Sequence, residues 1–167
     1  QAPLETLASE IGGIAIPCDM GDEASIQSLF QSASEQAGPV HIAINSAGAL
    51  AGNPIAALTR EAIQPTLDVS FIGALLMFKY AAEVMTEGGS IMTISSLTAR
   101  LPGPGLAVYA AARAGIDYAI KIAAVEYGEQ NIRFNSIAAG LIRTDMTDAI
   151  FEHSDSEERF IPHIPSG

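Results

Sequence analysis

Short apolar segments alternate with longer segments of helical periodicity along this chain, and this alternation restricts the fold more than any other feature. Four segments indicate strands, and they lie at 14–17, 40–45, 90–96 and 132–137. Taken together they read mostly as apolar runs, and residues that start or stop regular structure border them. Apolar strands separated by helices are typical of a parallel sheet that helices cover on both faces.

Helical segments occupy the intervals between the expected strands. Asp22 is placed to cap a helix that ends at Gly38-Pro39. A second helical region begins at Thr59, and we expect Pro65 to break or kink it, because proline lacks an N–H group and clashes with the preceding turn. The remaining helices are expected at 66–85, at 108–127 and from 145 onward.

The order of these elements predicts an α/β chain with a Rossmann-type three-layer sandwich, in which a doubly wound parallel sheet lies between helix layers. A length of 167 residues fits a single domain over 1–167. Gly12-Gly13 precedes an expected strand, whereas a phosphate-binding glycine turn follows one. The sequence also does not begin with Met, so we expect a fragment of a longer chain.

Charge and cysteine content limit the partners. A net charge of −11 argues against binding to nucleic acid or to an anionic membrane surface. The longest apolar stretch, at 71–78, is too short to span a bilayer. The single cysteine, Cys18, fits a reducing compartment, so we expect a cytoplasmic location. The histidines are not at metal-ligand spacing, and we expect no metal site.

Small and polar residues end or follow the expected strands at the edge where parallel sheets bind ligands. They are Asp19, the segment 45–48, Ser95-Ser96 and the segment 139–144. Each also has an ordinary structural explanation. Asp19 and the segment 45–48 can form turns, Ser96 can cap its own backbone, and Thr144 can cap the following helix.

Tyr109 and Arg113 lie four residues apart on an expected helix, so their side chains share one face. A guanidinium near a phenol favours the phenolate form, which would suit Tyr109 to general acid/base chemistry. Ser96 ends the strand before this helix, and its hydroxyl could hydrogen-bond a substrate oxygen. A surface stack of tyrosine on arginine is the structural alternative.

Six segments, in order, resemble the motifs of the classical short-chain dehydrogenase/reductase family. They are CDM at 18–20, INSAG at 44–48, LDVSFIG at 67–73, SIMTISS at 90–96, YAAAR at 109–113 and RFNSIAAGLIRTDM at 133–146. The resemblance covers about residues 10–150. It has no match for the strand, glycine-rich turn and helix that open the family's fold or for its last strand, so it implies a sheet that is incomplete at both ends. It implies a Rossmann-type fold and NAD- or NADP-dependent hydride transfer between a carbonyl and an alcohol.

The resemblance also implies a role for each matching residue. Tyr109 would donate or accept the proton, and Ser96 would orient the substrate oxygen. Arg113 stands where the family has a lysine that binds the nicotinamide ribose, and Ser70 stands where it has an asparagine that holds a relay water. The implied cofactor-binding residues are Asp19, Met20, Asn45, Ala47, Gly48, Gly140, Ile142 and Thr144.

Four positions depart from the family pattern, namely Ser46, Ser70, Arg113 and Ala139. Arginine keeps the charge of lysine but has a different shape and cannot carry a proton, so we expect slower chemistry. A catalytically weak or inactive relative, acting as a cofactor-binding or structural subunit, is therefore the alternative. Another Rossmann-like enzyme, such as a methyltransferase, is a third hypothesis.

Apolar residues also suggest the partners. The expected pocket walls, at Leu97, Leu101, Leu106 and Ile142, favour a mostly apolar carbonyl or alcohol substrate. The helices at 66–85 and 108–127 are apolar around most of their circumference. In the family these helices form the subunit interface, which implies a homodimer or homotetramer. The segment 146–164 is either a lid, as the resemblance implies, or a pair of surface helices.

Overall fold

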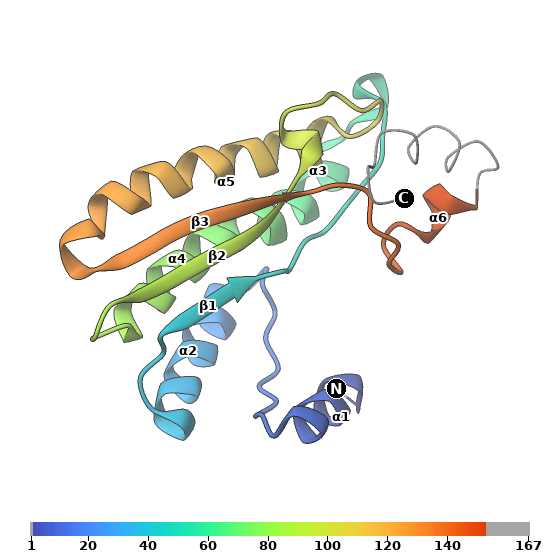
Figure 1. Cartoon of the computed structure of the whole chain (residues 1–167). Coiled ribbons are helices and arrows are strands. Elements are labelled where there is room, and N and C mark those ends of the chain that lie inside the picture. Colours follow the sequence, from blue (N-terminus) through green and yellow to red (C-terminus); the bar gives the residue numbers. More distant parts are fainter. Residues whose placement is uncertain (1, 153–167) are drawn as a thin grey trace.

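The computed structural model describes residues 2–152, and three parallel strands form the sheet among them (Figure 1). In spatial order the strands are β1 (Ile42–Asn45), β2 (Gly89–Ser96) and β3 (Ile132–Ala139). The α-helices are α1 (Ala2–Ile11), α2 (Glu23–Ala37), α3 (Arg60–Leu67), α4 (Gly73–Val84), α5 (Ala107–Glu126) and α6 (Asp148–Phe151). This architecture confirms the predicted α/β class with a parallel sheet.

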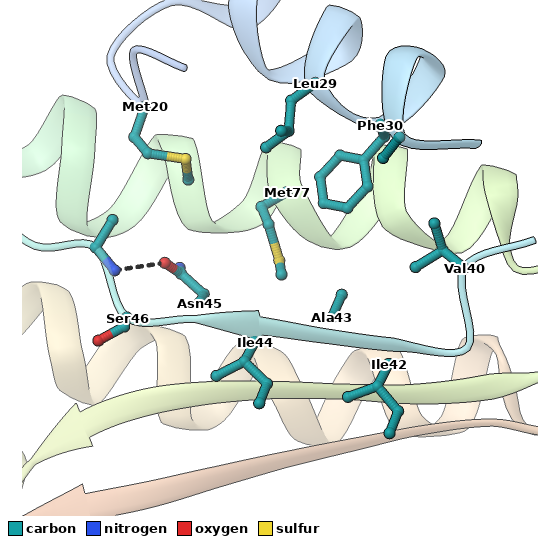
Figure 2. A pocket seen from close by; sticks show the side chains of 12 residues that line it. Met20, Leu29, Phe30, Val40, Ile42, Ala43, Ile44, Asn45, Ser46 and Met77 are labelled. Carbon is teal, nitrogen blue, oxygen red and sulfur yellow. Dashed lines mark hydrogen bonds between the residues drawn. The ribbon is translucent and has the colours of Figure 1, made fainter. Parts of the chain in front are cut away.

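Helices α2, α4 and α5 pack on one face of the sheet, where they enclose the core (Figure 1). Along β1 the side chains of Ala43 and Asn45 are buried beneath these helices, whereas Ile42 and Ile44 point the other way (Figure 2). Ile42 is 67% exposed and Ile44 is 58% exposed. The described residues therefore show the sheet and one helix layer of the expected three-layer sandwich.

The core joins all three strands to the three covering helices. Ala43 of β1 is in register with Ile91 of β2, which is in register with Phe134 of β3. Phe134 makes an edge-on contact with Phe78 of α4, with 5.5 Å between ring centroids. Burial of each large apolar side chain contributes about 1.5–3 kcal/mol, so this row anchors the helix layer on the sheet.

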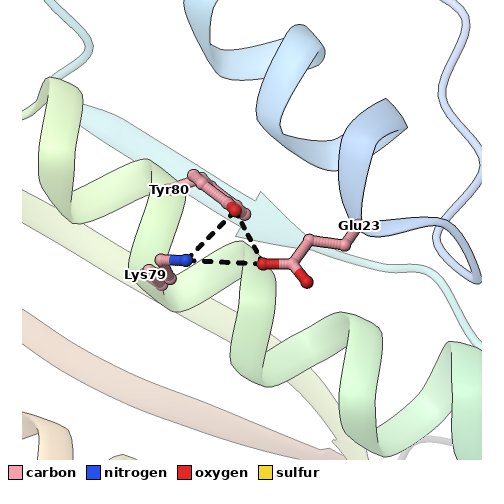
Figure 3. Close-up of polar contacts among 3 residues, drawn as sticks. All are labelled: Glu23, Lys79 and Tyr80. Atoms are coloured by element: carbon pink, nitrogen blue, oxygen red, sulfur yellow. Dashed lines mark hydrogen bonds and ion pairs between the residues drawn. The ribbon is translucent and has the colours of Figure 1, made fainter.

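Helix α2 begins and ends as its sequence predicts. The Asp22 carboxylate caps it by accepting a hydrogen bond from the Ser25 amide at 3.1 Å. Gly38 ends it with a φ of 84°, which favours glycine. A polar cluster of Glu23, Lys79 and Tyr80 joins α2 to α4 (Figure 3).

Pro65 does not end the helical region that begins after Thr59. It lies inside α3, and the backbone continues through a π-helical segment, Asp68–Ile72, directly into α4. The Asp68 amide bonds to the carbonyls of both Gln64 and Pro65. The expected irregularity therefore occurs three residues later, as a widened turn that carries Ser70. Such turns are frequent at functional sites.

The expected strand at 14–17 is absent, because residues 13–19 have no regular structure and no described strand pairs with them. A strand needs a hydrogen-bonding partner along its edge. Helix α1, which the pattern did not predict, precedes this segment. The last described helix begins at Asp148 instead of 145, with Thr147 at its N-cap. Most of the expected lid, from residue 153 onward, lies outside the described residues.

Candidate active site

The predicted ligand edge is formed by the carboxyl ends of the three strands (Figure 1). Ser96 ends β2 and is in register with Ala139, which ends β3. A short 3-10 turn, Leu97–Ala99, follows Ser96 and packs against α5, whose first turn carries Tyr109. The fold therefore brings Ser96 and Tyr109 to the same end of the molecule, as the spacing predicted.

Tyr109 and Arg113 pack against each other on α5. The guanidinium carbon lies 5.1 Å from the centroid of the phenol ring, a cation–π arrangement. Tyr109 is half-buried, whereas Arg113 is only 3% exposed. The Nη2 atom of Arg113 donates a hydrogen bond to the carbonyl oxygen of Ala47 at 3.1 Å. The predicted pair is therefore brought together, and Arg113 connects it to the loop after β1.

The loop after β1 is fixed by side chains from three elements. Asn45 accepts a hydrogen bond from the Ala47 amide through Oδ1 at 3.0 Å. The Ser70 hydroxyl accepts one from the Ala49 amide at 2.9 Å and donates one to the Ala49 carbonyl at 3.1 Å. Ser70 has no solvent exposure. Its hydroxyl is thus used on the backbone of the loop.

Ser96 caps the turn that follows it, which was its structural alternative. Its hydroxyl oxygen accepts hydrogen bonds from the amide of Thr98 at 3.2 Å and from the hydroxyl of Thr98 at 2.9 Å. These bonds fix the position of the Ser96 oxygen. Because the oxygen acts as the acceptor in both, the hydroxyl proton remains available for a substrate oxygen.

Asp19 forms the turn before α2, as its structural alternative predicted. Its Oδ1 atom accepts a hydrogen bond from the Gly21 amide at 2.8 Å, and its own amide donates to the Ser25 hydroxyl at 2.8 Å. The neighbouring Met20 lines an apolar groove beside β1 that also includes Asn45 and Ala47 (Figure 2). Of the residues implied on the adenosine side, Met20, Asn45 and Ala47 therefore border one groove, and Asp19 and Gly48 do not line it.

The segment after β3 carries the remaining candidates, and it is ordered by a residue that the sequence analysis missed. Gly140, Ile142 and Thr144 follow β3 at the ligand edge. The Thr147 hydroxyl donates to the Ile142 carbonyl at 2.7 Å and accepts from the Thr144 amide at 2.9 Å. Residue spacing in the sequence does not identify Thr147. Its hydroxyl bonds the backbone of its own loop, and such local bonds do not produce a periodic sequence pattern.

Several buried polar atoms have no hydrogen-bond partner in the described part of the chain. They are Nδ2 of Asn45, Oγ1 of Thr93, Oγ of Ser95, Nε and Nη1 of Arg113, and both carboxylate oxygens of Asp117. Buried polar groups are normally paired, and exceptions often mark functional regions. Most of these residues lie at or next to the ligand edge, and Thr93 and Asp117 were not expected from the sequence.

At the ligand edge, Ser96 and Tyr109 are accessible enough to fit a nicotinamide cofactor, whereas Arg113 is not. Ser96 and Tyr109 are half-buried and lie beside exposed loop residues, as a site that must admit a reactant requires. The Nε and Nη1 atoms of Arg113 are not solvent-accessible, so Arg113 does not fit as a cofactor ligand. In the described residues no group of three or more potential metal ligands gathers, and no helix is long and apolar enough to cross a membrane.

Comparison with known proteins gives consistent matches. The family model described as enoyl-(acyl carrier protein) reductase matches residues 1–167. A 3-oxoacyl-[acyl-carrier-protein] reductase from Mus musculus is 32% identical over 96% of the chain. An enoyl-[acyl-carrier-protein] reductase [NADH] from Bacillus subtilis is 35% identical over 87% of it. A short-chain type dehydrogenase/reductase structure from Mycobacterium ulcerans covers 85% of the chain, with 30% identity and a TM-score of 0.80.

The chain spans only part of each of these proteins. It covers 67% of the mouse reductase, 60% of the B. subtilis reductase and 53% of the M. ulcerans structure.

Proposed function

The chain belongs to the short-chain dehydrogenase/reductase family, and we propose that the protein that carries it interconverts a carbonyl and an alcohol with NAD or NADP. The observation that carries this proposal is the packing of Tyr109 on a buried arginine at the edge where Ser96 ends β2. A phenol and a fixed hydroxyl at one edge are the groups that proton transfer to a substrate oxygen requires.

In this proposal the residues of the chain position the reactants and move the proton. Ser96 donates a hydrogen bond to the substrate oxygen and holds that oxygen beside Tyr109. The Tyr109 phenol gives a proton to that oxygen during reduction and takes one from it during oxidation. The nicotinamide, when bound, supplies or accepts the hydride. Arg113 and Ser70 stand at the positions of the family's catalytic lysine and asparagine, and they hydrogen-bond the backbone of Ala47 and Ala49, respectively.

The cofactor-binding residues follow from the same family assignment. Asp19 and Met20 would lie near the adenine, and Asn45, Ala47 and Gly48 near the adenosine half. Gly140, Ile142 and Thr144 would face the nicotinamide. The name of the B. subtilis relative specifies NADH. Both NAD and NADP remain within the proposal.

The proposed substrate is a small, mostly apolar carbonyl compound or alcohol. Leu97 and Leu101 are 44% and 57% exposed after β2, and Ile142 is 60% exposed after β3, so apolar surface borders the site. Neither nucleic acid nor a membrane is a proposed partner. The proposed cytoplasmic location rests on the single cysteine, Cys18.

Assembly into a homodimer or homotetramer is also proposed. An apolar groove runs between α4 and α5, lined by residues that include Leu75, Ala119 and Ile122. Val125, on α5, is 82% exposed. Exposed apolar side chains that gather on two adjacent helices favour a protein interface.

A catalytically weak or inactive relative, serving as a cofactor-binding or structural subunit, is the second candidate. The buried head of Arg113 favours it, since that side chain does not reach the surface where a cofactor would bind. The family assignment leaves no support for a methyltransferase.

One experiment separates the two candidates. NADH and NADPH are titrated against the full-length protein, and turnover is then measured with a panel of aldehydes and ketones. The enzyme proposal predicts binding of at least one cofactor and consumption of that cofactor with an apolar carbonyl. Binding without turnover would support the cofactor-binding subunit, and the absence of binding would contradict the enzyme proposal and leave only a structural subunit.

A further inference from the structure

Arg113 is a charged side chain whose head is shut off from solvent. It is 3% exposed, and its Nε and Nη1 atoms are buried without a hydrogen-bond partner among the described residues. Its Nη2 atom is bound to the Ala47 carbonyl. A ligand can contact only atoms that it reaches, so this arginine lies beneath the ligand edge.

Gly48 provides the space that the guanidinium occupies. A Cβ atom built on Gly48 would lie 2.1 Å from Nη2 and 3.3 Å from Cζ of Arg113. Any side chain at position 48 would displace the guanidinium. The need for glycine at position 48 therefore comes from the Arg113 side chain beneath it. The sequence alone had suggested a different reason, namely that small residues let a flat ligand approach the backbone.

Building on the proposed function, we propose that Arg113 is a positioning residue that acts on Tyr109 and on the loop 47–49 from beneath, without contacting the cofactor. Its guanidinium touches the phenol ring on one side and holds the Ala47 carbonyl on the other. It thereby ties the first turns of α5 to the loop after β1. Ser70 holds the same loop two residues further on, through Ala49.

The shape of arginine suits this task better than that of lysine. The planar guanidinium has donors on three nitrogens and stacks on aromatic rings, and it loses less hydration on burial than an ammonium group. A lysine here would have a single donor group to share between the ring and the carbonyl. The pairing of Arg113 with Gly48 is thus a matched arrangement within this chain.

The test uses the full-length protein and three variants, Arg113→Met, Gly48→Ala and the double variant. We measure kcat, the dissociation constants of NADH and NADPH, and hydrogen exchange at the Ala47 and Ala49 amides. Arg113→Met is expected to lower kcat about tenfold or more and to speed exchange at these amides about tenfold, while cofactor affinity stays within about twofold.

The double variant tests directly whether Arg113 and Gly48 act through the same contact. Gly48→Ala should reproduce the loss of kcat and the faster amide exchange of Arg113→Met, and the double variant should be no worse than Arg113→Met alone in these two measurements, because both changes remove the same contact. Arg113→Lys, which keeps the charge, should recover part of the lost kcat and remain below the wild type. If Arg113→Met does not fold, Arg113→Lys and Gly48→Ala carry the same measurements.

Three results would overturn the inference. They are a rise of about tenfold in a cofactor dissociation constant for Arg113→Met, additive effects in the double variant, or unchanged amide exchange. If the wild type neither binds nor turns over, the proposed function fails by itself. The exchange measurements still decide whether Arg113 and Gly48 hold the loop.

Discussion

Ser70 makes two hydrogen bonds to the backbone of one residue, Ala49, from a position with no solvent exposure. Removing the hydroxyl leaves a buried amide and carbonyl without these partners. Ser70→Ala is therefore expected to lower the free energy of unfolding by about 1–3 kcal/mol. Urea denaturation measures this change.

The matched control for that variant is Ser46→Ala, at an exposed position of the same loop. It is expected to change stability by no more than about 0.5 kcal/mol. Equal effects at the two positions would show that Ser70 does not hold the loop.

The residue scale also shows what the sequence could predict at the site. The four-residue spacing of Tyr109 and Arg113 correctly placed them on one face of a helix. Spacing could not show that Arg113 is buried and bonded to Ala47, since that contact joins residues 66 positions apart. From the sequence, arginine in place of lysine predicts only slower chemistry. The structure adds that Gly48 leaves the space that the guanidinium occupies.

At the scale of elements, Gly73 allows α4 to approach the segment before α2. A Cβ atom on Gly73 would lie 2.1 Å from the carbonyl oxygen of Met20. An alanine inside a helix is normally more favourable than glycine by about 1 kcal/mol. Here we expect Gly73→Ala to destabilise the protein by about 1–3 kcal/mol, because the backbone of Met20 must move.

Gly115→Ala is the comparison for Gly73→Ala. Its Cβ would meet the ring of Phe71 at 2.8 Å, and a side-chain ring can shift where backbone cannot. Thermal unfolding of both variants should give the larger loss for Gly73→Ala. A stabilised Gly73→Ala protein would contradict the observed packing of α4.

The cluster of Glu23, Lys79 and Tyr80 makes the docking of α2 on α4 depend on pH (Figure 3). Hydrogen bonds from Tyr80 and then Lys79 hold the pKa of the Glu23 carboxyl below its usual 4.5. Its contribution to stability is therefore present above pH 4.5 and is lost as the pH falls through the lowered pKa. The pKa of Lys79 is raised above 10.5, mainly by Tyr80, so its contribution is lost only as the pH rises through that raised value.

Tyr80→Phe keeps the ring and removes the hydroxyl that bonds Glu23 and Lys79. We expect a loss of stability near neutral pH that shrinks as the pH falls from 4.5 through the lowered pKa of Glu23, below which Glu23 is protonated in both proteins. Denaturation across this range measures it, with the exposed Tyr118→Phe as the control. A loss that is independent of pH would assign the effect to packing alone.

The element scale shows where periodicity succeeds and where it fails. Helices α2 and α5 and strands β2 and β3 lie within about two residues of their predicted bounds, because their apolar spacing coincides with burial. The segment 14–17 has the composition of a strand but no strand beside it in the described residues. Composition cannot supply a hydrogen-bonding partner.

For the whole molecule, the exposed apolar surface of α4 and α5 leads to a prediction about assembly. Ile122→Glu places a charge in the groove between these helices, where Ile122 is 47% exposed. If this groove is a subunit interface, the dissociation constant of the oligomer should rise about 30-fold or more. Sedimentation measures it, with Ile55→Glu, at a 76% exposed residue outside these helices, as the control. Unchanged association of the Ile122 variant would place the interface elsewhere.

The account as a whole depends on Tyr109 as the group that moves the proton. The most direct test is the kcat of Tyr109→Phe, with a carbonyl substrate that the wild type reduces and with cofactor binding measured alongside. Phenylalanine keeps the ring on Arg113 and removes only the hydroxyl. We expect kcat to fall about 100-fold or more while the cofactor dissociation constant changes little. Turnover equal to that of the wild type would contradict the proposed role of Tyr109 and the mechanism built on it.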